Sequence, residues 1–168
     1  MKEIFTRRSI RNYTDKIVED EKIEKLLRAA MQAPSAGNQK AWEFIVVKDK
    51  KRLKNLAKTS LYGGPIAKAP LAIVVLGNED NMKYSENWEQ DLGAATQNLL
   101  LEAVSLNLGA VWIGIAPVEE RIENVRNLFT LPLTVKPYCV IAIGYPAKGQ
   151  ENKFIDRYDA SKVHKEVY

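Results

Sequence analysis

Three arginines and a serine lie within five residues near the start of the chain, in the run Arg7-Arg8-Ser9-Ile10-Arg11. The planar guanidinium group is the side chain best shaped to form paired hydrogen bonds with the oxygens of a phosphate. A short basic run near a terminus is also typical of a solvated surface that contacts anions without specificity. The run alone therefore leaves two interpretations open, a phosphate site and a solvated face.

A second polar stretch, Ala33-Pro34-Ser35-Ala36-Gly37-Asn38-Gln39, follows one predicted helix later. Its small and polar residues predict a loop. The loop carries hydroxyl, amide and backbone donors and no charge, so it could hydrogen-bond a polar ligand held beside the arginines. The alternative is a connecting loop with a proline stop.

A third feature is the run Gly109-Ala110-Val111-Trp112-Ile113-Gly114, which reads as a strand punctuated by glycine. A glycine inside a strand often marks the close approach of a ligand or of another backbone segment. Glu86, Glu89 and Asp91 are interpreted as surface charges and not as metal ligands, and no metal constellation is found in the sequence.

The composition fits one soluble domain of 168 residues, with 46% hydrophobic and 27% charged residues. The net charge is +4, but no basic stripe with interleaved aromatics occurs, which disfavours nucleic-acid binding and leaves a small anionic ligand compatible. One cysteine, Cys139, excludes an intrachain disulfide and a thiolate zinc site. No signal peptide and no apolar run near the ~20 residues of a membrane span are found, so we expect no membrane partner and a cytoplasmic protein.

Hydrophobic periodicity predicts alternating helices and strands. The expected helices cover 2–8, 19–33, 49–58, 88–107 and 117–128, and the expected strands cover 42–47, 70–76, 108–115 and 135–146. The strand at 42–47 is expected to be buried on both faces, 62–65 to be a loop, and 78–87 to be a mobile flap. With no repeat and no linker, this order predicts a single α/β domain over 1–168.

The helix at 88–107 is apolar around most of its circumference, and Gly93, Ala94 and Ala95 would allow another helix to approach it closely. Such a helix is either a core helix or one that also buries a face in a partner, so we expect a homodimer. The polar tail, 147–168, has no helical stripe and is expected to wrap over a partner surface.

The separated segments occur in an order and spacing that resemble the nitroreductase family of FMN-dependent oxidoreductases. The resemblance spans nearly the whole chain. It is carried by Arg7–Tyr13, Ala33–Trp42, Asp91–Asn98, Gly109–Gly114 and Gly144-Tyr145-Pro146.

The resemblance implies an α+β fold, a three-layer sandwich whose central sheet is mixed, mainly antiparallel and flanked by helices. It also implies a homodimer with two FMN sites at its interface and with each C-terminal tail extending onto the partner. In such an enzyme a hydride passes from NAD(P)H through flavin N5 to a nitroaromatic, quinone or similar acceptor in a ping-pong cycle, and the cofactor carries the chemistry.

By position, the resemblance assigns the phosphate end of FMN to Arg7 and Arg157, with Arg8 and Ser9 contacting phosphate or ribityl. Arg11 would reach the flavin N1/O2 edge, where a guanidinium stabilises the anionic reduced flavin. The remaining cofactor-binding residues are implied to approach N5 through the backbone, Ile113 and Gly114, or to line the flavin from the other subunit, Pro34, Ser35, Ala36 and Asn38.

One departure concerns the tail, where many members carry a lysine two positions before the arginine and this chain has Ile155. Either Lys153 substitutes for that lysine or the phosphate has one contact less. Two alternative functions stay open. One is a family relative with other flavin chemistry, namely reductive dehalogenation or flavin fragmentation, and the other is a non-enzymatic flavin-binding protein.

Overall fold

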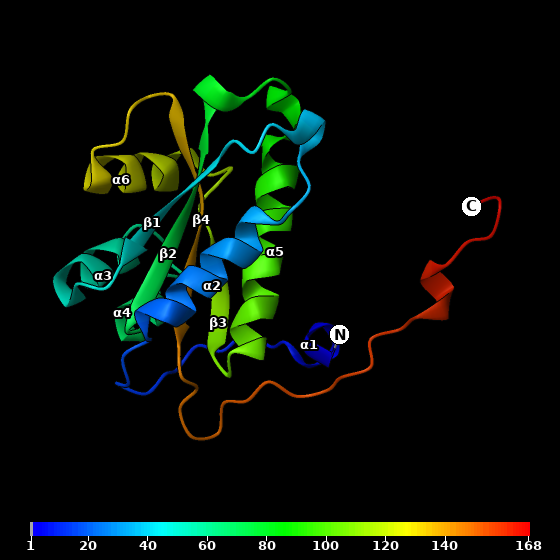
Figure 1. Cartoon of the computed structure of the whole chain (residues 1–168), viewed down its shortest axis with the longest axis horizontal. Helices are drawn as coiled ribbons and strands as arrows, with labels where there is room; N and C mark the ends of the chain where they lie inside the picture. The colour runs from blue at the N-terminus through cyan, green and yellow to red at the C-terminus, as the bar shows by residue number, and fades with distance from the viewer. Residues whose placement is uncertain (1) are drawn as a thin grey trace.

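The computed structural model describes residues 2–168 and shows a four-stranded sheet between two layers of helices (Figure 1). The sheet has the strand order β1-β2-β4-β3, and each neighbouring pair is antiparallel. The strands are β1 (Trp42–Val47), β2 (Leu71–Asn78), β3 (Gly109–Gly114) and β4 (Val135–Gly144).

Helices cover both faces of this sheet, with α2 and α5 on one face and α3, α4 and α6 on the other (Figure 1). The helices are α1 (Lys2–Thr6), α2 (Asp20–Met31), α3 (Lys50–Ala57), α4 (Gly64–Lys68), α5 (Trp88–Ser105) and α6 (Glu119–Phe129). Short 3-10 turns are η1 (Ala36–Asn38), η2 (Glu79–Asn81), η3 (Ser85–Asn87) and η4 (Ala160–Lys162). Among residues 2–168, no helix combines the length and the apolar character of a membrane span.

The two central strands separate two hydrophobic cores, because successive side chains of a strand point to opposite faces. Ile73 and Ile141 pack with α2 and α5, whereas Val74 and Val140 pack with α3, α4 and α6. All four side chains are completely buried. The apolar runs in β2 and β4 therefore reflect a sheet covered on both faces.

The predicted α+β three-layer sandwich is confirmed, whereas the α/β reading of the helix–strand alternation is wrong. An α/β sheet needs crossovers that carry the chain back to make parallel neighbours. Here α3 and α4 pack against each other and return the chain to the end of the sheet that it left, so Val47 pairs with Ala72. The one parallel pairing described within residues 2–168 is an isolated bridge, Ser9 with Ala110.

Three local predictions also change. β1 is an edge strand, and Val46 is 37% exposed, so burial on both faces is wrong. The predicted loop 62–65 is shorter than expected, because α4 already begins at Gly64. The segment 78–87, predicted as a mobile flap, contains η2 and η3 and is held by hydrogen bonds described below.

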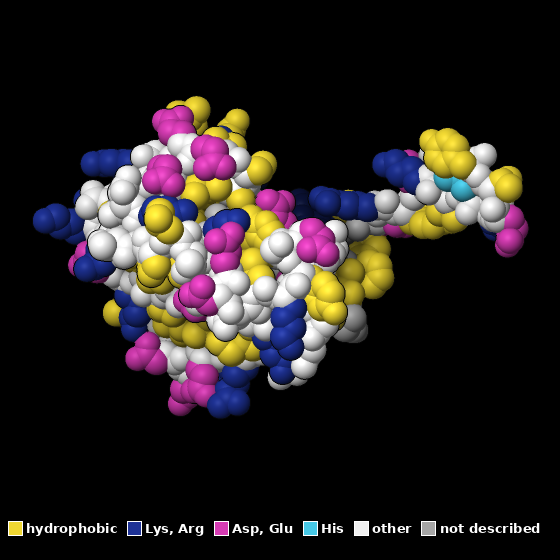
Figure 2. Space-filling model, turned by 90° about the horizontal axis from the view of Figure 1, so that it is seen from above, with side chains coloured by type: hydrophobic (Ala, Val, Ile, Leu, Met, Phe, Trp, Pro, Cys, Tyr) yellow, Lys and Arg dark blue, Asp and Glu magenta, His cyan; other side chains and the backbone are white. Residues whose placement is uncertain are grey.

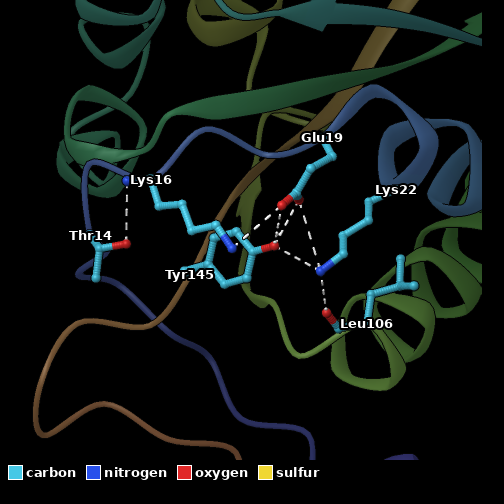
Figure 3. A network of polar contacts seen from close by, with 6 residues as sticks. All are labelled: Thr14, Lys16, Glu19, Lys22, Leu106 and Tyr145. Atoms are coloured by element: carbon cyan, nitrogen blue, oxygen red, sulfur yellow. Dashed lines mark hydrogen bonds and ion pairs between the residues drawn. The ribbon is translucent and has the colours of Figure 1, made fainter.

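A polar cluster joins the start of α2 to the exit of β4 (Figure 3). The Tyr145 hydroxyl donates to the two Glu19 carboxylate oxygens at 2.7 and 3.0 Å and accepts from Lys22 Nζ at 2.7 Å. Lys22 also donates to the Leu106 carbonyl at 3.1 Å, just beyond the end of α5. Lys16 Nζ lies 4.0 Å from the centre of the Tyr145 ring. The cluster connects the start of α2, the exit of β4 and the residue after the end of α5.

Replacing Tyr145 with phenylalanine is expected to lower the stability of the protein near neutral pH. The stability of the variant should also decrease less than that of the wild type when the pH is lowered. The Tyr145 hydroxyl is the main reason that the pKa of Glu19 falls from 4.5 to about 2. A carboxyl whose pKa is lower in the folded state adds stability above its unfolded pKa and loses it as the pH falls toward the folded pKa. Thermal unfolding at about pH 6 and about pH 3 measures this difference. Equal pH dependence in both proteins would show that the hydroxyl does not hold Glu19.

Candidate functional site

The arginine segment is fixed along the edge of β3. Ile10 donates its backbone N–H to the Ala110 carbonyl at 3.0 Å, and its side chain is 2% exposed. Successive side chains of this segment point alternately toward and away from the core, so Arg7, Ser9 and Arg11 lie outside the core that Ile10 enters. A buried isoleucine therefore anchors a segment whose polar side chains face away from the packing.

Two amide side chains of the C-terminal tail bind the backbone of the same segment. Asn152 Oδ1 accepts from the Arg8 N–H at 3.0 Å, and Gln150 Oε1 accepts from the Arg11 N–H at 3.2 Å. Asn152 also donates to the Leu108 carbonyl at 3.0 Å. The two amides belong to residue types with no distinctive spacing in the sequence, and sequence reasoning missed them.

Positive charge is concentrated here without ion-pair partners among residues 2–168. Burial lowers the pKa of Arg7, and the nearby guanidinium groups of Arg157 and Arg8 lower it further. Among residues 2–168, none of the ion pairs involves Arg7, Arg8, Arg11 or Arg157. The structure therefore brings Arg7 and Arg157, the two arginines predicted to bind the phosphate, close enough to repel each other. A dianionic group between them would stabilise this arrangement.

Arg8 differs from the other arginines, because its guanidinium folds back on α1. It donates to the Phe5 carbonyl at 2.9 Å and to the Arg7 carbonyl. Its Nε is buried without a hydrogen-bond partner. In this conformation Arg8 satisfies carbonyls at the end of α1 while its charge stays close to Arg7.

An open cleft of about 470 Å³ runs between β3 and α4. Arg11, Ile113 and Gly114, three of the predicted site residues, line it together. The full lining comprises Arg11, Leu61, Tyr62, Gly64, Pro65, Val111, Trp112, Ile113 and Gly114. A smaller hollow of about 190 Å³ brings Arg8 and Ser9 together with Lys153. Lys153 thus lies beside two of the residues that the resemblance assigns to the phosphate or ribityl, Arg8 and Ser9.

The predicted loop residues Pro34, Ser35, Ala36 and Asn38 do not lie in this cleft. The Ala36 N–H bonds Asp91 in the first turn of α5, whereas Asn152 bonds Leu108 just past the end of that helix. The 18 residues of α5 span about 27 Å at 1.5 Å per residue. Within one chain, the loop and the arginine segment therefore lie at opposite ends of α5.

The prediction that Asp91 is a surface charge is wrong, since its side chain is 5% exposed. Asp91 Oδ1 accepts from the Ala36 N–H at 2.9 Å, and Oδ2 accepts from Gln39 Nε2 at 2.6 Å. These two donors take the place of the water molecules that would otherwise hydrate the carboxylate. No group of three or more His, Cys, Asp or Glu side chains arranged for a metal ion occurs in the part of the chain that the structure describes.

Gly114 offers a test of close approach by a ligand. A Cβ built there meets no atom nearer than the Ala116 carbonyl oxygen at 4.0 Å, so Gly114→Ala is expected to fold with unchanged stability. If a flavin approaches this backbone, the methyl group should weaken FMN binding by about tenfold through steric overlap. Titration of the apoprotein with FMN and thermal unfolding measure the two quantities. Unchanged FMN affinity would remove Gly114 from the site.

Taken together, the structure is an α+β sandwich with a cleft at the edge of its sheet, lined by Arg11 and the strand β3. The Nitroreductase family model matches residues 4–87 and 58–145. The chain belongs to the nitroreductase family.

Relatives of known name and structure agree. A protein of Archaeoglobus fulgidus named "Putative NADH dehydrogenase/NAD(P)H nitroreductase" is 43% identical over 100% of this chain and 98% of its own length. The crystal structure of a "Putative NADH Oxidase" from Clostridium acetobutylicum is 58% identical, with a TM-score of 0.97 over 99% of both chains. The crystal structure of "a putative nitroreductase in complex with fmn" from Desulfovibrio desulfuricans is 34% identical, with a TM-score of 0.84. The match covers 99% of this chain and 96% of that chain. The predicted family is confirmed, and the relatives agree with the predicted cofactor and enzyme class.

Proposed function

We propose that this protein is an FMN-dependent oxidoreductase that oxidises NAD(P)H and reduces a nitroaromatic, a quinone or a similar planar acceptor. The observation that carries the proposal is the set of arginines on the segment beside β3, none of which has an ion-pair partner among residues 2–168 and one of which, Arg11, lines the cleft. One related structure in complex with FMN and another described as an FMN-dependent nitroreductase support the choice of cofactor. The "Oxygen-insensitive NADPH nitroreductase" of Salmonella typhimurium, 31% identical over 87% of this chain, supports the acceptor class.

FMN, when bound, supplies hydride acceptance and release at N5. The task of the chain is to hold the cofactor and to set its electrostatic surroundings. Arg7 and Arg157 would hold the phosphate, since their mutual repulsion disappears when a dianion lies between them. Arg11, in the cleft, would place a permanent positive charge beside the N1/O2 edge and so favour the reduced anion.

Ser9 and Lys153 would complete the phosphate end, and Lys153 would take the place of the lysine that Ile155 replaces. Ile113 and Gly114 would present backbone to N5. In this arrangement no side chain acts as a nucleophile, and specificity depends on which planar molecules fit over the exposed flavin face.

A homodimer is part of the proposal, because one chain leaves the loop 35–38 at the opposite end of α5 from its own arginine segment. A second copy lying antiparallel along α5 would bring that loop to the cleft of the first. Exposed apolar side chains in the tail support such a partner surface, with Phe154 64% and Tyr158 76% exposed. Figure 2 shows hydrophobic side chains gathered on the tail where it stands away from the body.

The decisive experiment is anaerobic addition of NADH or NADPH to the FMN-loaded protein, followed by a quinone or a nitroaromatic. We expect the absorbance of the oxidised flavin to bleach with at least one nucleotide and to return with the acceptor. A protein that does not retain FMN would contradict the proposal. A protein that retains FMN without bleaching would instead be a flavin-binding protein without this activity.

A further inference from the structure

A buried carboxylate organises two segments at the start of α5. Asp91 accepts from the Ala36 N–H and from Gln39 Nε2, and both partners belong to the loop 35–40. Among residues 2–168, none of the ion pairs involves Asp91. Because a buried charge is costly unless hydrogen bonds replace its water, these two donors are required for the carboxylate to stay inside.

Gln39 passes this anchoring on to the neighbouring segment. Its Oε1 accepts from the backbone N–H groups of Lys83 and Tyr84, both at 2.9 Å. Its Nε2, besides bonding Asp91, donates to the Tyr84 carbonyl at 3.2 Å. One amide side chain thus connects the loop 35–40, the segment 82–84 and the helix α5.

The side chain of Tyr84 closes the same unit. Its ring lies against Gly37, where a Cβ would come within 2.3 Å of Tyr84 Cε2. The loop beneath the ring is locally unfavourable, with positive φ angles at Gly37 (51°), Asn38 (55°) and Lys40 (51°). Left-handed backbone at non-glycine residues persists only where surrounding contacts impose it. The Asp91–Gln39–Tyr84 contacts are such a support.

We propose that Asp91 and Gln39 are positioning residues that hold the loop 35–38 and the segment 82–84 as one rigid wall for the flavin site of the partner subunit. The inference rests on the proposed function, in which Ser35, Ala36 and Asn38 line the flavin. Tyr84, 47% exposed on top of this loop, then belongs to the entrance through which the acceptor reaches the flavin. The buried carboxylate at the start of α5 controls the shape of a site that lies in another copy of the chain.

Asp91→Asn is the sharpest variant, because it keeps the size of the side chain. The asparagine oxygen replaces one acceptor, and its NH₂ group would face the donor of Ala36 or of Gln39. We expect FMN binding to weaken by about tenfold, the loss that follows when one charge-assisted hydrogen bond is replaced by facing donors. Glu89→Gln, an exposed carboxylate on the same helix, is the matched control and should bind FMN as the wild type does.

Gln39→Leu is a second variant, which keeps the Asp91–Ala36 bond and removes every bond to 83–84. It should reproduce the weaker FMN binding, and the double variant should be no weaker than the stronger of the two effects, since both act through one unit. Thermal unfolding of each apoprotein shows whether it folds, and FMN affinity follows from the quenching of flavin fluorescence. If Asp91→Asn does not fold, Gln39→Leu alone carries the test.

Mixed dimers separate this inference from a structural role. One subunit carries Arg7→Ala and Arg11→Ala, which disable its cleft, and the other carries Asp91→Asn, which disables its loop. If the loop serves the partner, the mixture regains one site with wild-type FMN affinity per dimer, because the intact cleft receives the intact loop. Differently tagged subunits allow the mixed dimer to be isolated.

The outcomes are distinguishable. Wild-type affinity in Asp91→Asn, or in Gln39→Leu if only that variant folds, overturns the inference while the proposed function stands. Weakened affinity without recovery in isolated mixed dimers also overturns it, because the loop would then act on its own cleft or through stability alone. Failure of the wild-type protein to bind FMN overturns the proposed function itself. Weakened binding with recovery in the mixed dimer supports the inference.

Discussion

Replacing Arg7 with alanine is expected to weaken FMN binding by about 30- to 100-fold while leaving the apoprotein no less stable. A charge-assisted hydrogen bond to phosphate contributes about 2–3 kcal/mol, and 1.4 kcal/mol corresponds to a factor of ten. The guanidinium of Arg7 is partly desolvated and lies near Arg157 and Arg8. Its removal therefore takes away one of the positive charges that would bind the phosphate.

The stability part of this prediction follows from the sign of the pKa shift. The pKa of Arg7 is lower in the folded protein than its ordinary value. A base with a lowered folded pKa is charged less favourably in the fold than in the unfolded chain, so at neutral pH its charge opposes folding. Deleting it should leave the melting temperature of the apoprotein unchanged or higher.

The measurements are FMN titration at two salt concentrations and thermal unfolding without FMN. The dependence of FMN affinity on salt should become weaker in the variant, because one ionic contact is gone. Arg52→Ala, an exposed arginine on α3, is the control and should change neither quantity. An affinity equal to that of the wild type would exclude Arg7 from the phosphate site. A lower melting temperature with weaker binding would indicate a structural role instead.

Replacing Gly109 with alanine is expected to lower both stability and FMN affinity. A Cβ at Gly109 would lie 2.6 Å from Cβ and from Cγ2 of Ile10, too close for carbon atoms that are not bonded to each other. Ile10 is buried and bonds the backbone of Ala110, so it cannot turn away without releasing the segment that carries Arg11. Overpacking of this kind costs about 1–3 kcal/mol.

The displaced segment also carries Ser9 and the backbone N–H groups that Asn152 and Gln150 hold. We therefore expect FMN affinity to fall by about tenfold or more in addition to the loss of stability. Urea unfolding measures the first effect, and FMN titration under conditions where the variant is folded measures the second. Gly114→Ala, at the other end of β3, is the matched comparison, because it should weaken binding alone. A folded Gly109→Ala protein with wild-type FMN affinity would show that the arginine segment is not coupled to β3.

Much of the fold could be predicted from local pattern. The apolar and β-branched run at 42–47 coincides with β1, and the broad apolar stripe at 88–107 is α5, with Leu92 and Leu99 completely buried. These predictions succeed because burial imposes a period of about 2 or 3.6 on neighbouring residues. The resemblance to the nitroreductase family, and not a local pattern, assigned Arg11 and Gly114 to the site, and the structure places both in one cleft.

Strand direction could not be predicted in this way. Periodicity reports which residues are buried but not which strand lies beside which, and the packing of α3 on α4 decided that β1 and β2 are antiparallel. The same limit applies to Asp91, which is a charged residue on a helix with no local sign of burial. Only its contacts with Ala36 and Gln39, 55 and 52 positions away in the chain, make it an interior group.

The amino-acid sequence by itself determined the family, the positions of nearly all helices and strands, and the residue types that can bind a phosphate. Those properties depend on neighbours along the chain and on motifs whose order is preserved. The tertiary structure alone decided that Asn152 and Gln150 brace the arginine segment and that the loop 35–38 lies at the far end of α5 from that segment. Contacts between distant segments form only when the whole core has packed, so no local pattern records them.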